Sequence, residues 1–359
     1  MTAYFLRRLL LIPLTFVVIT FLVYAIQRLT PGGPIEQARL KMLTAATEGG
    51  GGGRASPTGN MDLPPEAMKQ LERYYKLDRS IPVGYLIWLG LWPDADAGGR
   101  FSGILEGNFG KSYRYSEPVL DTITSRFPVS IYFGLIGYLM SWVVCVPLGV
   151  WKALKHRTWF DTSTSIVVFL GYAIPGFVAC LVLLLLFATD LWHSWLPLGG
   201  FRSENWADMW AQGEWWWCVK DQVKHTIIPI VGEVIGAFAT TTILMKNSLL
   251  DNLGADYVRT AFAKGLSQRR VVYVHAMRNS LIPLVVGIGY AIGILFAGSF
   301  LIEKTCNING MGLLGFTSLV ERDYPVLMGI LVFLVLIGLV GNIISDLVLA
   351  LVDPRVRFK

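Results

Sequence analysis

The sequence has little of what metal sites and covalent catalysis require. Its 359 residues include four histidines, four cysteines and only 16% charged residues. The histidines and cysteines form no HExxH motif, no CxxC pair and no other spacing typical of zinc ligands. No Ser/His or paired-aspartate arrangement stands out inside an apolar segment, which argues against an intramembrane enzyme. We therefore expect no metal, no catalytic residue and no cofactor bound by this chain.

Apolar residues are abundant instead. They make up 53% of the chain, and the mean hydropathy is +0.52. They occur in blocks of about 18 to 25 residues, the length with which a helix crosses roughly 30 Å of hydrocarbon. The sequence therefore predicts an all-α polytopic membrane protein with six transmembrane helices. The predicted spans are Leu9–Ile26, Val129–Val150, Ile166–Ala188, Ile227–Met245, Leu281–Leu301 and Val326–Leu351.

Lysine and arginine set the expected topology. The formal net charge is +6, which could suggest a nucleic-acid partner, but the basic residues lie at the ends of apolar blocks and in the loops between them. Short loops rich in Lys and Arg stay in the cytoplasm. Both termini are therefore predicted to be cytoplasmic, and no nucleic-acid partner is expected. Arg7 and Arg8 precede the first span without a cleavage pattern after it, so we expect that span to be retained.

Three regions follow from this topology. Residues 1–28 are the N-terminus and first span, 29–127 form a large outside loop with a flexible glycine-rich segment at 44–60, and 128–359 form the core with the remaining spans. Within the outside loop, the apolar stretch Ile81–Trp92 is too short to span and is expected to lie against the bundle or the interface. Cys218 and Cys306 fall on the same outside face, and the sequence leaves open whether they pair.

The cytoplasmic loop 246–280, between the fourth and fifth spans, carries the strongest local signal. Good helix formers run from Asp256 and end at Gly265, a residue type that commonly stops helices. A short helix followed by a glycine turn suits a rigid element that inserts into a groove on a soluble partner. The alternative is an ordinary basic loop that only obeys the orientation rule.

Several motifs resemble those of a known protein family. The segment Arg259-Thr-Ala-x-Ala-Lys-Gly265, with Arg278-Asn279 and Ile282-Pro283, resembles the EAA loop of ABC importer permeases of the oligopeptide and dipeptide class. Further matches cover essentially the whole chain: Leu29-Thr-Pro-Gly-Gly-Pro34, Gly107-Asn-Phe-Gly-Lys-Ser112, Gly171-Tyr-Ala-Ile-Pro175, Asn309-Gly-Met-Gly-Leu-Leu-Gly315, Arg322-Asp-Tyr-Pro325 and Leu351-Val-Asp-Pro-Arg355. The glycine-rich insertion and the C-terminal half look most like the Yej-type subfamily of peptide importers.

The resemblance implies a fold, a role and partners. The fold would be a MetI-like permease bundle with a large periplasmic loop after the first helix, in the bacterial inner membrane. The chain would import oligopeptides by ATP-driven alternating access, and the resemblance leaves open whether peptide-like antibiotics are a second cargo. Its implied partners are a second homologous permease subunit, cytoplasmic ABC ATPase domains that bind ATP and Mg, a periplasmic peptide-binding protein, the lipid bilayer and the oligopeptide itself.

The resemblance also implies site residues. Asp256 to Gly265 would form the coupling helix that seats in a cleft of the ATPase. The implied coupling residues are Asp256, Tyr257, Arg259, Thr260, Ala261, Ala263, Lys264, Gly265, Arg278 and Asn279. One departure is Phe262, where relatives often carry a basic or polar residue. The segment Gly107–Ser112 ends like a phosphate-binding loop, but a Walker A motif needs glycine where Leu105 stands, so hydrolysis is assigned to separate subunits.

Residues inside the spans supply two further hypotheses. Glu233 and Asp346 are ionisable and are candidates for the translocation path, although a helix-to-helix hydrogen bond is the alternative, favoured for Asp346. Small residues recur every four positions and predict helix packing within the bundle or against a second permease subunit. These glycines are Gly232, Gly236, Gly289 and Gly293. The competing function is an ion-coupled secondary transporter, which would usually show inverted repeats and several buried charges.

Overall fold

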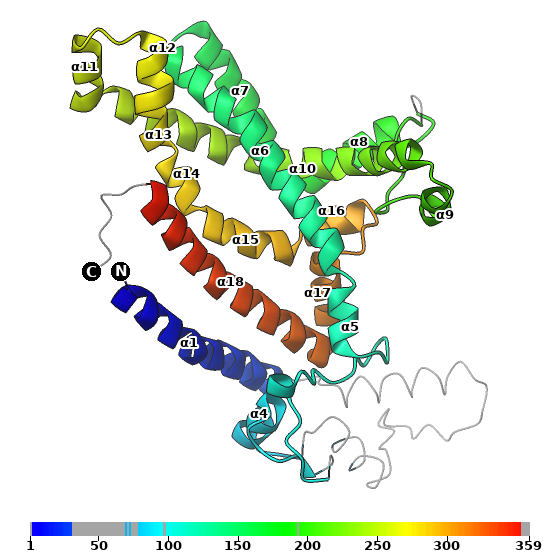
Figure 1. Ribbon diagram of the computed structural model, residues 1–359. Helices are drawn as coiled ribbons and strands as arrows, with labels where there is room; N and C mark the ends of the chain where they lie inside the picture. The colour runs from blue at the N-terminus through cyan, green and yellow to red at the C-terminus, as the bar shows by residue number, and fades with distance from the viewer. Residues whose placement is uncertain are drawn as a thin grey trace, which may run out of the picture. The chain divides into compact units, whose positions relative to one another are not determined.

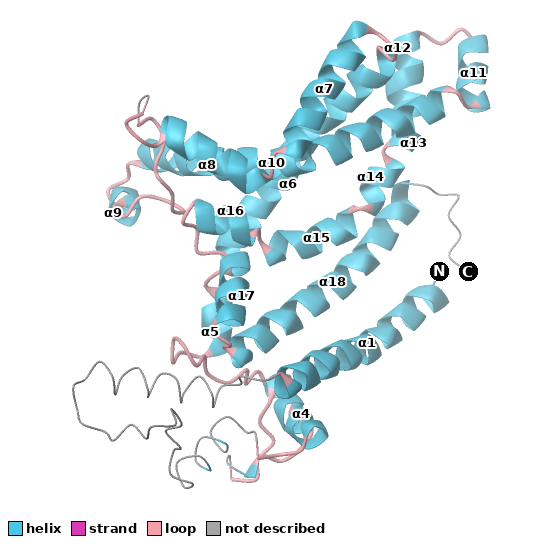
Figure 2. Ribbon diagram, turned by 180° about the vertical axis from the view of Figure 1, so that it is seen from behind, coloured by secondary structure: helices cyan, strands magenta, loops and turns pink. Residues whose placement is uncertain are grey.

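The structure is a computed structural model that describes residues 2–30, 69, 72, 78–95, 98–191 and 194–352. Throughout these ranges the regular secondary structure is helical, and the only β pairing is two isolated bridges, Asp94 with Arg100 and Lys111 with Pro118 (Figure 2). The prediction of an all-α protein is confirmed. The predicted flexible segment 44–60 lies outside the described residues.

Four helices are each long and apolar enough to cross a membrane (Figure 1). They are α1 (Thr2–Leu29), α6 (Phe127–Leu154), α10 (Trp215–Leu253) and α18 (Tyr324–Val352). Two bent helix pairs pass the same test, which gives six candidate spans in the described residues if each pair is counted once. The predicted number of six is therefore the upper end of what the helices allow.

The third span was predicted as one helix, and the structure corrects this. Helix α7 (Trp159–Ala173) and α8 (Gly176–Phe187) meet at an angle of 92°. Pro175 disfavours the helical conformation in the residue before it, and Ile174 is indeed extended, with φ −93° and ψ 115°. The segment is thus a broken span or a re-entrant hairpin rather than a straight crossing.

The fifth span is also interrupted. After the short helices α12 (Gln268–Arg270), α13 (Met277–Ser280) and α14 (Ile282–Val286), the chain bends by 46° into α15 (Ile288–Ala297) and α16 (Phe300–Thr305). Between α15 and α16, Gly298 adopts φ 69° and ψ 179°. Only glycine adopts this conformation readily, so Gly298 ends α15 there.

The fourth span begins earlier than predicted. Helix α10 starts at Trp215 rather than Ile227, so part of the preceding outside loop, which is rich in tryptophan, is helical. The short helix α9 (Trp206–Ala211) precedes it, and the ring centroids of Trp206 and Trp210 stack 5.1 Å apart. Trp215 and Trp216 remain exposed. All four cysteines are free, so the open question of a Cys218–Cys306 disulfide is answered in the negative.

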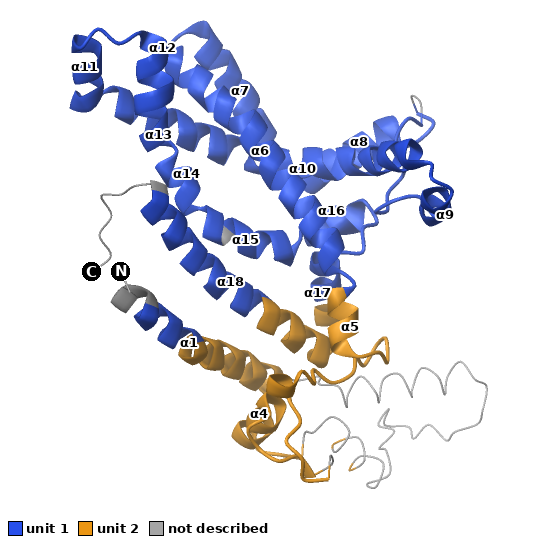
Figure 3. Ribbon diagram, viewed as in Figure 1, with its two compact units in different colours: residues 1–12, 125–316, 334–359 blue, residues 13–124, 317–333 orange. Residues whose placement is uncertain are grey.

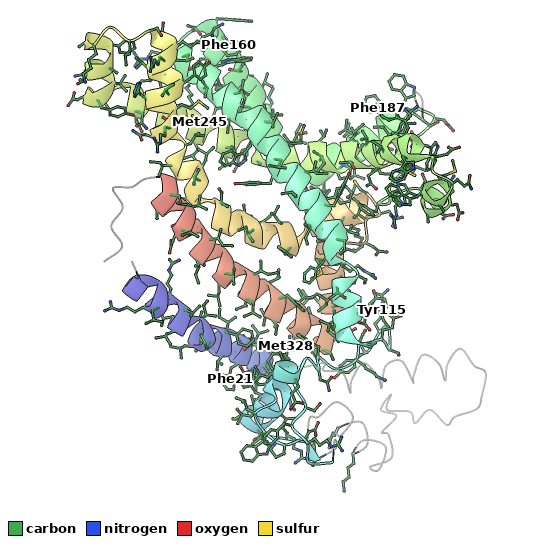
Figure 4. All side chains as sticks on the ribbon, in the orientation of Figure 1. Phe21, Tyr115, Phe160, Phe187, Met245 and Met328 are labelled. Atoms are coloured by element: carbon green, nitrogen blue, oxygen red, sulfur yellow. The ribbon has the colours of Figure 1, made fainter. Side chains whose placement is uncertain are left out.

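The chain divides into two compact units, each described here by itself (Figure 3). The first comprises residues 1–12, 125–316 and 334–359, and its most extensive helix contact joins α6 to α10. The absence of a side chain at Gly149 lets these two helices approach closely. A Cβ there would stand only 2.7 Å from the Met245 Cβ and 2.8 Å from the Thr242 carbonyl oxygen. Met245, labelled in Figure 4, is fully buried there.

The second unit comprises residues 13–124 and 317–333. In it, the predicted non-spanning helix is present as α4 (Ile81–Leu89), and it packs on α1. Tyr85 and Thr20 share a hydrogen bond of 2.8 Å between their hydroxyls, and the Phe21 ring, labelled in Figure 4, meets Tyr85 edge to face. The other helical elements of this unit are the 3₁₀ turn η2 (Ile104–Glu106), α5 (Val119–Thr124) and the adjoining ends of α17 (Met311–Val320) and α18.

Candidate docking loop and membrane cavity

The predicted short helix and glycine turn are both present. Helix α11 (Asp256–Ala263) begins after Ala255, which is extended, and carries Asp256 in its first turn, where a carboxylate complements the helix dipole. The chain leaves the helix at Lys264, and Gly265 adopts a left-handed φ of 76°. A residue with a Cβ rarely adopts this conformation, which explains why glycine stands at the turn.

One face of α11 anchors it to the rest of the first unit. Val258 and Ala261 are buried in a cluster with Met245 and Leu249 of α10 and Val271 of the π-helical turn η3 (Val271–Ala276). Full burial of a valine, leucine or methionine side chain contributes roughly 1.5–3 kcal/mol to stability. The helix is therefore held by packing rather than by charge.

The opposite face of α11 is exposed. Arg259 and Asp256 form only a solvent-exposed ion pair at 3.5 Å, which is of little energetic weight. Most of the predicted coupling residues are exposed, whereas Ala261 is buried and Asn279 half-buried. The exposed members are Asp256, Tyr257, Arg259, Thr260, Ala263, Lys264, Gly265 and Arg278. Phe262 is exposed among them, so α11 presents an aromatic side chain as well as charge.

The hydrogen bonds that brace the loop come from two serines that the sequence did not single out. The Ser248 hydroxyl donates to the Ser280 carbonyl at 2.8 Å, and the Ser280 hydroxyl reaches the Ala276 and Ser248 carbonyls at 2.8 and 3.3 Å. Within the described residues, the side chains of Arg278 and Asn279 make no hydrogen bond. A serine at each end of a helical loop gives no distinctive pattern, so sequence alone offered no signal.

A buried charge network next to this loop was also missed. The Asp161 carboxylate of α7 accepts from the Lys246 ammonium of α10 at 2.7 and 2.8 Å and pairs with Lys152 of α6 at 3.1 Å. Lys152 is almost fully buried and also donates to the Thr164 and Ser165 hydroxyls. The network ties α6, α7 and α10 together. From sequence alone, lysines at the ends of apolar blocks indicate only the topology.

A cavity of about 730 Å³ opens in the first unit. It is bounded by α6, the α7–α8 junction, α10 and the α14–α16 segment, and its lining is mostly apolar, aromatic or glycine. Glu233 lines it from α10, with the carboxylate directly against Gly137 of α6. The predicted path residue Glu233 therefore faces a cavity.

Glu303 of α16 is a second carboxylate in this cavity, missed because the predicted fifth span ended at Leu301. Its oxygens accept hydrogen bonds from the backbone N–H groups of Ser299, Gly312 and Leu313, at 3.2, 3.4 and 2.7 Å. A Cβ on Gly298 or Gly310 would collide with this carboxylate. Gly298, and Gly310 of the Asn309–Gly315 motif, thus make room for a buried acid.

Asp346 has a different environment. Its carboxylate forms an ion pair with Arg8 of α1, and the Arg8 guanidinium also donates to the Asn342 carbonyl at 3.0 Å. Asp346 is not among the cavity-lining residues. This arrangement favours the helix-packing interpretation over a place on the translocation path.

The four glycines predicted to pack helices fall into two pairs. A Cβ on Gly232 would stand 2.3 Å from the Cys180 Sγ, and one on Gly289 would stand 2.3 Å from the Gly341 carbonyl oxygen. Both positions therefore lie at close helix contacts. By contrast, a Cβ on Gly236 or Gly293 would meet no atom of the described residues within 4 Å.

Residues 145–358, which include the α11 loop and most of the cavity, match the family described as binding-protein-dependent transport system inner membrane component. The chain belongs to this family. It is 36% identical over 379 positions to the inner membrane ABC transporter permease protein YejB of Escherichia coli O157:H7, covering 100% of each chain. It is 35% identical over 377 positions to the peptidoglycan transport system permease protein YejB of Agrobacterium fabrum, covering 100% of this chain and 99% of the relative.

A Gram-positive relative is similar over the same length. The oligopeptide transport system permease protein AppB of Bacillus subtilis is 29% identical over 359 positions, covering 100% of each chain. Family membership confirms the permease fold, the inner-membrane location and the assignment of a non-catalytic membrane subunit that works with ATPase and binding-protein partners. It decides against the ion-coupled secondary transporter.

Proposed function

We propose that this permease moves oligopeptides across the inner membrane by ATP-driven alternating access. The observation that carries the proposal is full-length similarity to permeases named for oligopeptide and dipeptide transport. A second candidate cargo is a peptidoglycan fragment, because the A. fabrum relative is named for peptidoglycan transport. The two cargoes share a short peptide and differ in the attached sugar.

In this proposal α11 is the coupling helix. Its buried face packs against α10. A movement imposed on its exposed face would therefore move α10 as well, because no flexible linker separates the two helices in this contact. The exposed aromatic side chains Tyr257 and Phe262 suit insertion into a cleft of the ATPase, where aromatic anchors dominate binding energy. Arg278 and Asn279, free of side-chain hydrogen bonds in the described chain, would contact the partner or support that contact.

The cavity would be this subunit's part of the translocation path, with Glu233 lining it. The partner would be a second homologous permease. Gly293 of α15 has open space beside it, which suits the close approach of a helix from another subunit. Asp346, by contrast, would support the pairing of α1 and α18.

The test is transport by the complete importer reconstituted in proteoliposomes, with a radiolabelled tripeptide and a muropeptide as cargoes. ATP-dependent uptake of the tripeptide supports the proposal. Uptake of the muropeptide alone would replace the oligopeptide assignment by the second candidate, and uptake driven by an ion gradient without ATPase would contradict both.

Coupling is tested separately by charge reversal. Arg259→Glu on the exposed face of α11 is expected to reduce ATPase association at least tenfold. Arg269→Glu, an equally exposed arginine on α12, serves as the matched control and should bind the ATPase normally. Equal effects of both substitutions would show that the cytoplasmic loop contributes only general positive charge.

A further inference from the structure

The cavity lining carries acid but no base. Of the side chains that line it, only Glu233 and Glu303 are charged types, and lysine, arginine and histidine are absent from the described lining. A cargo carboxylate would find no cationic partner on these walls. Any charged group that this wall attracts must therefore be positive.

The two carboxylates differ in what they already bind. Glu303 is saturated by three backbone N–H groups and is almost completely buried. Glu233 has no hydrogen bond or ion pair to any described residue. A carboxyl group without a partner in mostly apolar surroundings is costly to ionise, and this cost falls when an ammonium group lies beside it.

Two aromatic rings line the same cavity as Glu233. Tyr138 and Trp142 of α6 both line it, with their ring centroids 5.8 Å apart, and Gly137 against the Glu233 carboxylate is the neighbour of Tyr138. Ring faces attract ammonium groups, most strongly where water is excluded. Carboxylate and aromatic rings together provide the two features by which proteins usually bind an organic cation.

From this geometry we propose that Glu233, with the Tyr138–Trp142 pair, binds the side-chain ammonium of a lysine residue in the cargo and makes the permease prefer lysine-containing peptides. The inference rests on the proposed function, since it specifies which peptides pass the same cavity. A volume of about 730 Å³ lies within the roughly 300–1,000 Å³ usual for small-ligand sites, so a short peptide fits. Glu233 is thus a specificity-determining residue rather than a helix-packing one.

The experiment compares two tripeptides that differ in one charge. Ala-Lys-Ala and Ala-norleucine-Ala have side chains of similar length, and only the former carries a side-chain ammonium. Initial uptake rates are measured with the complete reconstituted importer and saturating binding protein. The readout is the lysine-to-norleucine rate ratio of each variant relative to wild type, so that any preference of the binding protein cancels.

Glu233→Gln is expected to lower this ratio at least tenfold while norleucine-peptide uptake stays within twofold of wild type. Glu233→Asp should retain part of the preference. Glu214→Gln, an exposed carboxylate just before α10, is the matched control and should leave the ratio unchanged. An unchanged ratio in Glu233→Gln with both peptides transported would overturn the inference and leave the proposed function intact.

A second variant keeps the test decisive if Glu233→Gln is inactive. Gly236 lies one turn from Glu233 on the same helix face with open space beside it, so Gly236→Lys places a competing ammonium in the cavity. It should depress lysine-peptide uptake at least tenfold more than norleucine-peptide uptake, whereas Gly236→Leu should affect both alike. Equal losses for the two peptides in Gly236→Lys would overturn the inference. Failure of wild type to transport either peptide would instead contradict the proposed function.

Discussion

The Asp323 carboxylate accepts a hydrogen bond from the Ser112 hydroxyl, a residue 211 positions earlier in the sequence. The same carboxylate accepts from the backbone N–H groups of Tyr113 and Arg114, at 3.1 and 3.3 Å. Both Ser112 and Asp323 are buried. The Gly-Lys-Ser sequence that looked like a phosphate-binding loop thus binds an anion of its own chain, and it joins two of the motifs that carried the family resemblance.

Removing either partner leaves a buried polar group unpaired. Ser112→Ala and Asp323→Ala are expected to destabilise the second unit by about 1–3 kcal/mol, with the larger loss for Asp323→Ala because hydrogen bonds to a carboxylate are stronger than those to a hydroxyl. The midpoint of thermal unfolding in detergent measures the effect. Thr124→Ala, at an exposed hydroxyl, is the control. Equal midpoints for Ser112→Ala and the control would show that the bond does not stabilise the unit.

The apolar blocks predicted the helices well because span length and hydropathy depend on local composition. Pro175 and Gly298 are visible in the sequence, but the sequence does not show whether they break a span. That depends on which neighbouring residues form hydrogen bonds with the backbone groups freed at a break. The docking helix was predictable from Asp256 and Gly265. Its supports, such as Ser248 with Ser280, were not, because they join residues that are close only after folding.

Asp161 provides a second prediction, because its carboxylate pairs with two lysine ammonium groups inside the first unit. Asp161→Asn leaves Lys152 buried without its counterion, and breaking such a pair costs about 3–5 kcal/mol. The unfolding midpoint should fall clearly. Asp256→Asn breaks an exposed ion pair on α11 and should leave the midpoint unchanged. If the two variants unfold alike, the buried network carries no net stability.

Gly232 tests the close contact between α8 and α10. A Cβ there would overlap the Cys180 sulfur and approach the Gly176 carbonyl oxygen to 2.9 Å, and because backbone cannot rotate away, α8 must shift. Gly232→Ala is expected to cost about 1–3 kcal/mol by overpacking. Gly236→Ala, on the same helix but beside open space, should be neutral or slightly stabilising. The midpoints of thermal unfolding of both variants are measured in parallel. An unchanged midpoint for Gly232→Ala would show that α8 and α10 can move apart at little cost.

Gly265 separates backbone conformation from side-chain contact in the docking loop. A Cβ there would meet no atom of the described residues within 4 Å, so the constraint is the left-handed φ of 76° rather than space. Asparagine tolerates this conformation and valine does not. Gly265→Val should therefore reduce transport-coupled ATP hydrolysis several-fold by displacing the end of α11, whereas Gly265→Asn should retain most of it. ATPase rates of the complete importer with and without cargo provide the measurement. Equal impairment by Asn and Val would mean that the position must be bare to fit the partner surface, and equal activity would mean that the turn does not position the helix.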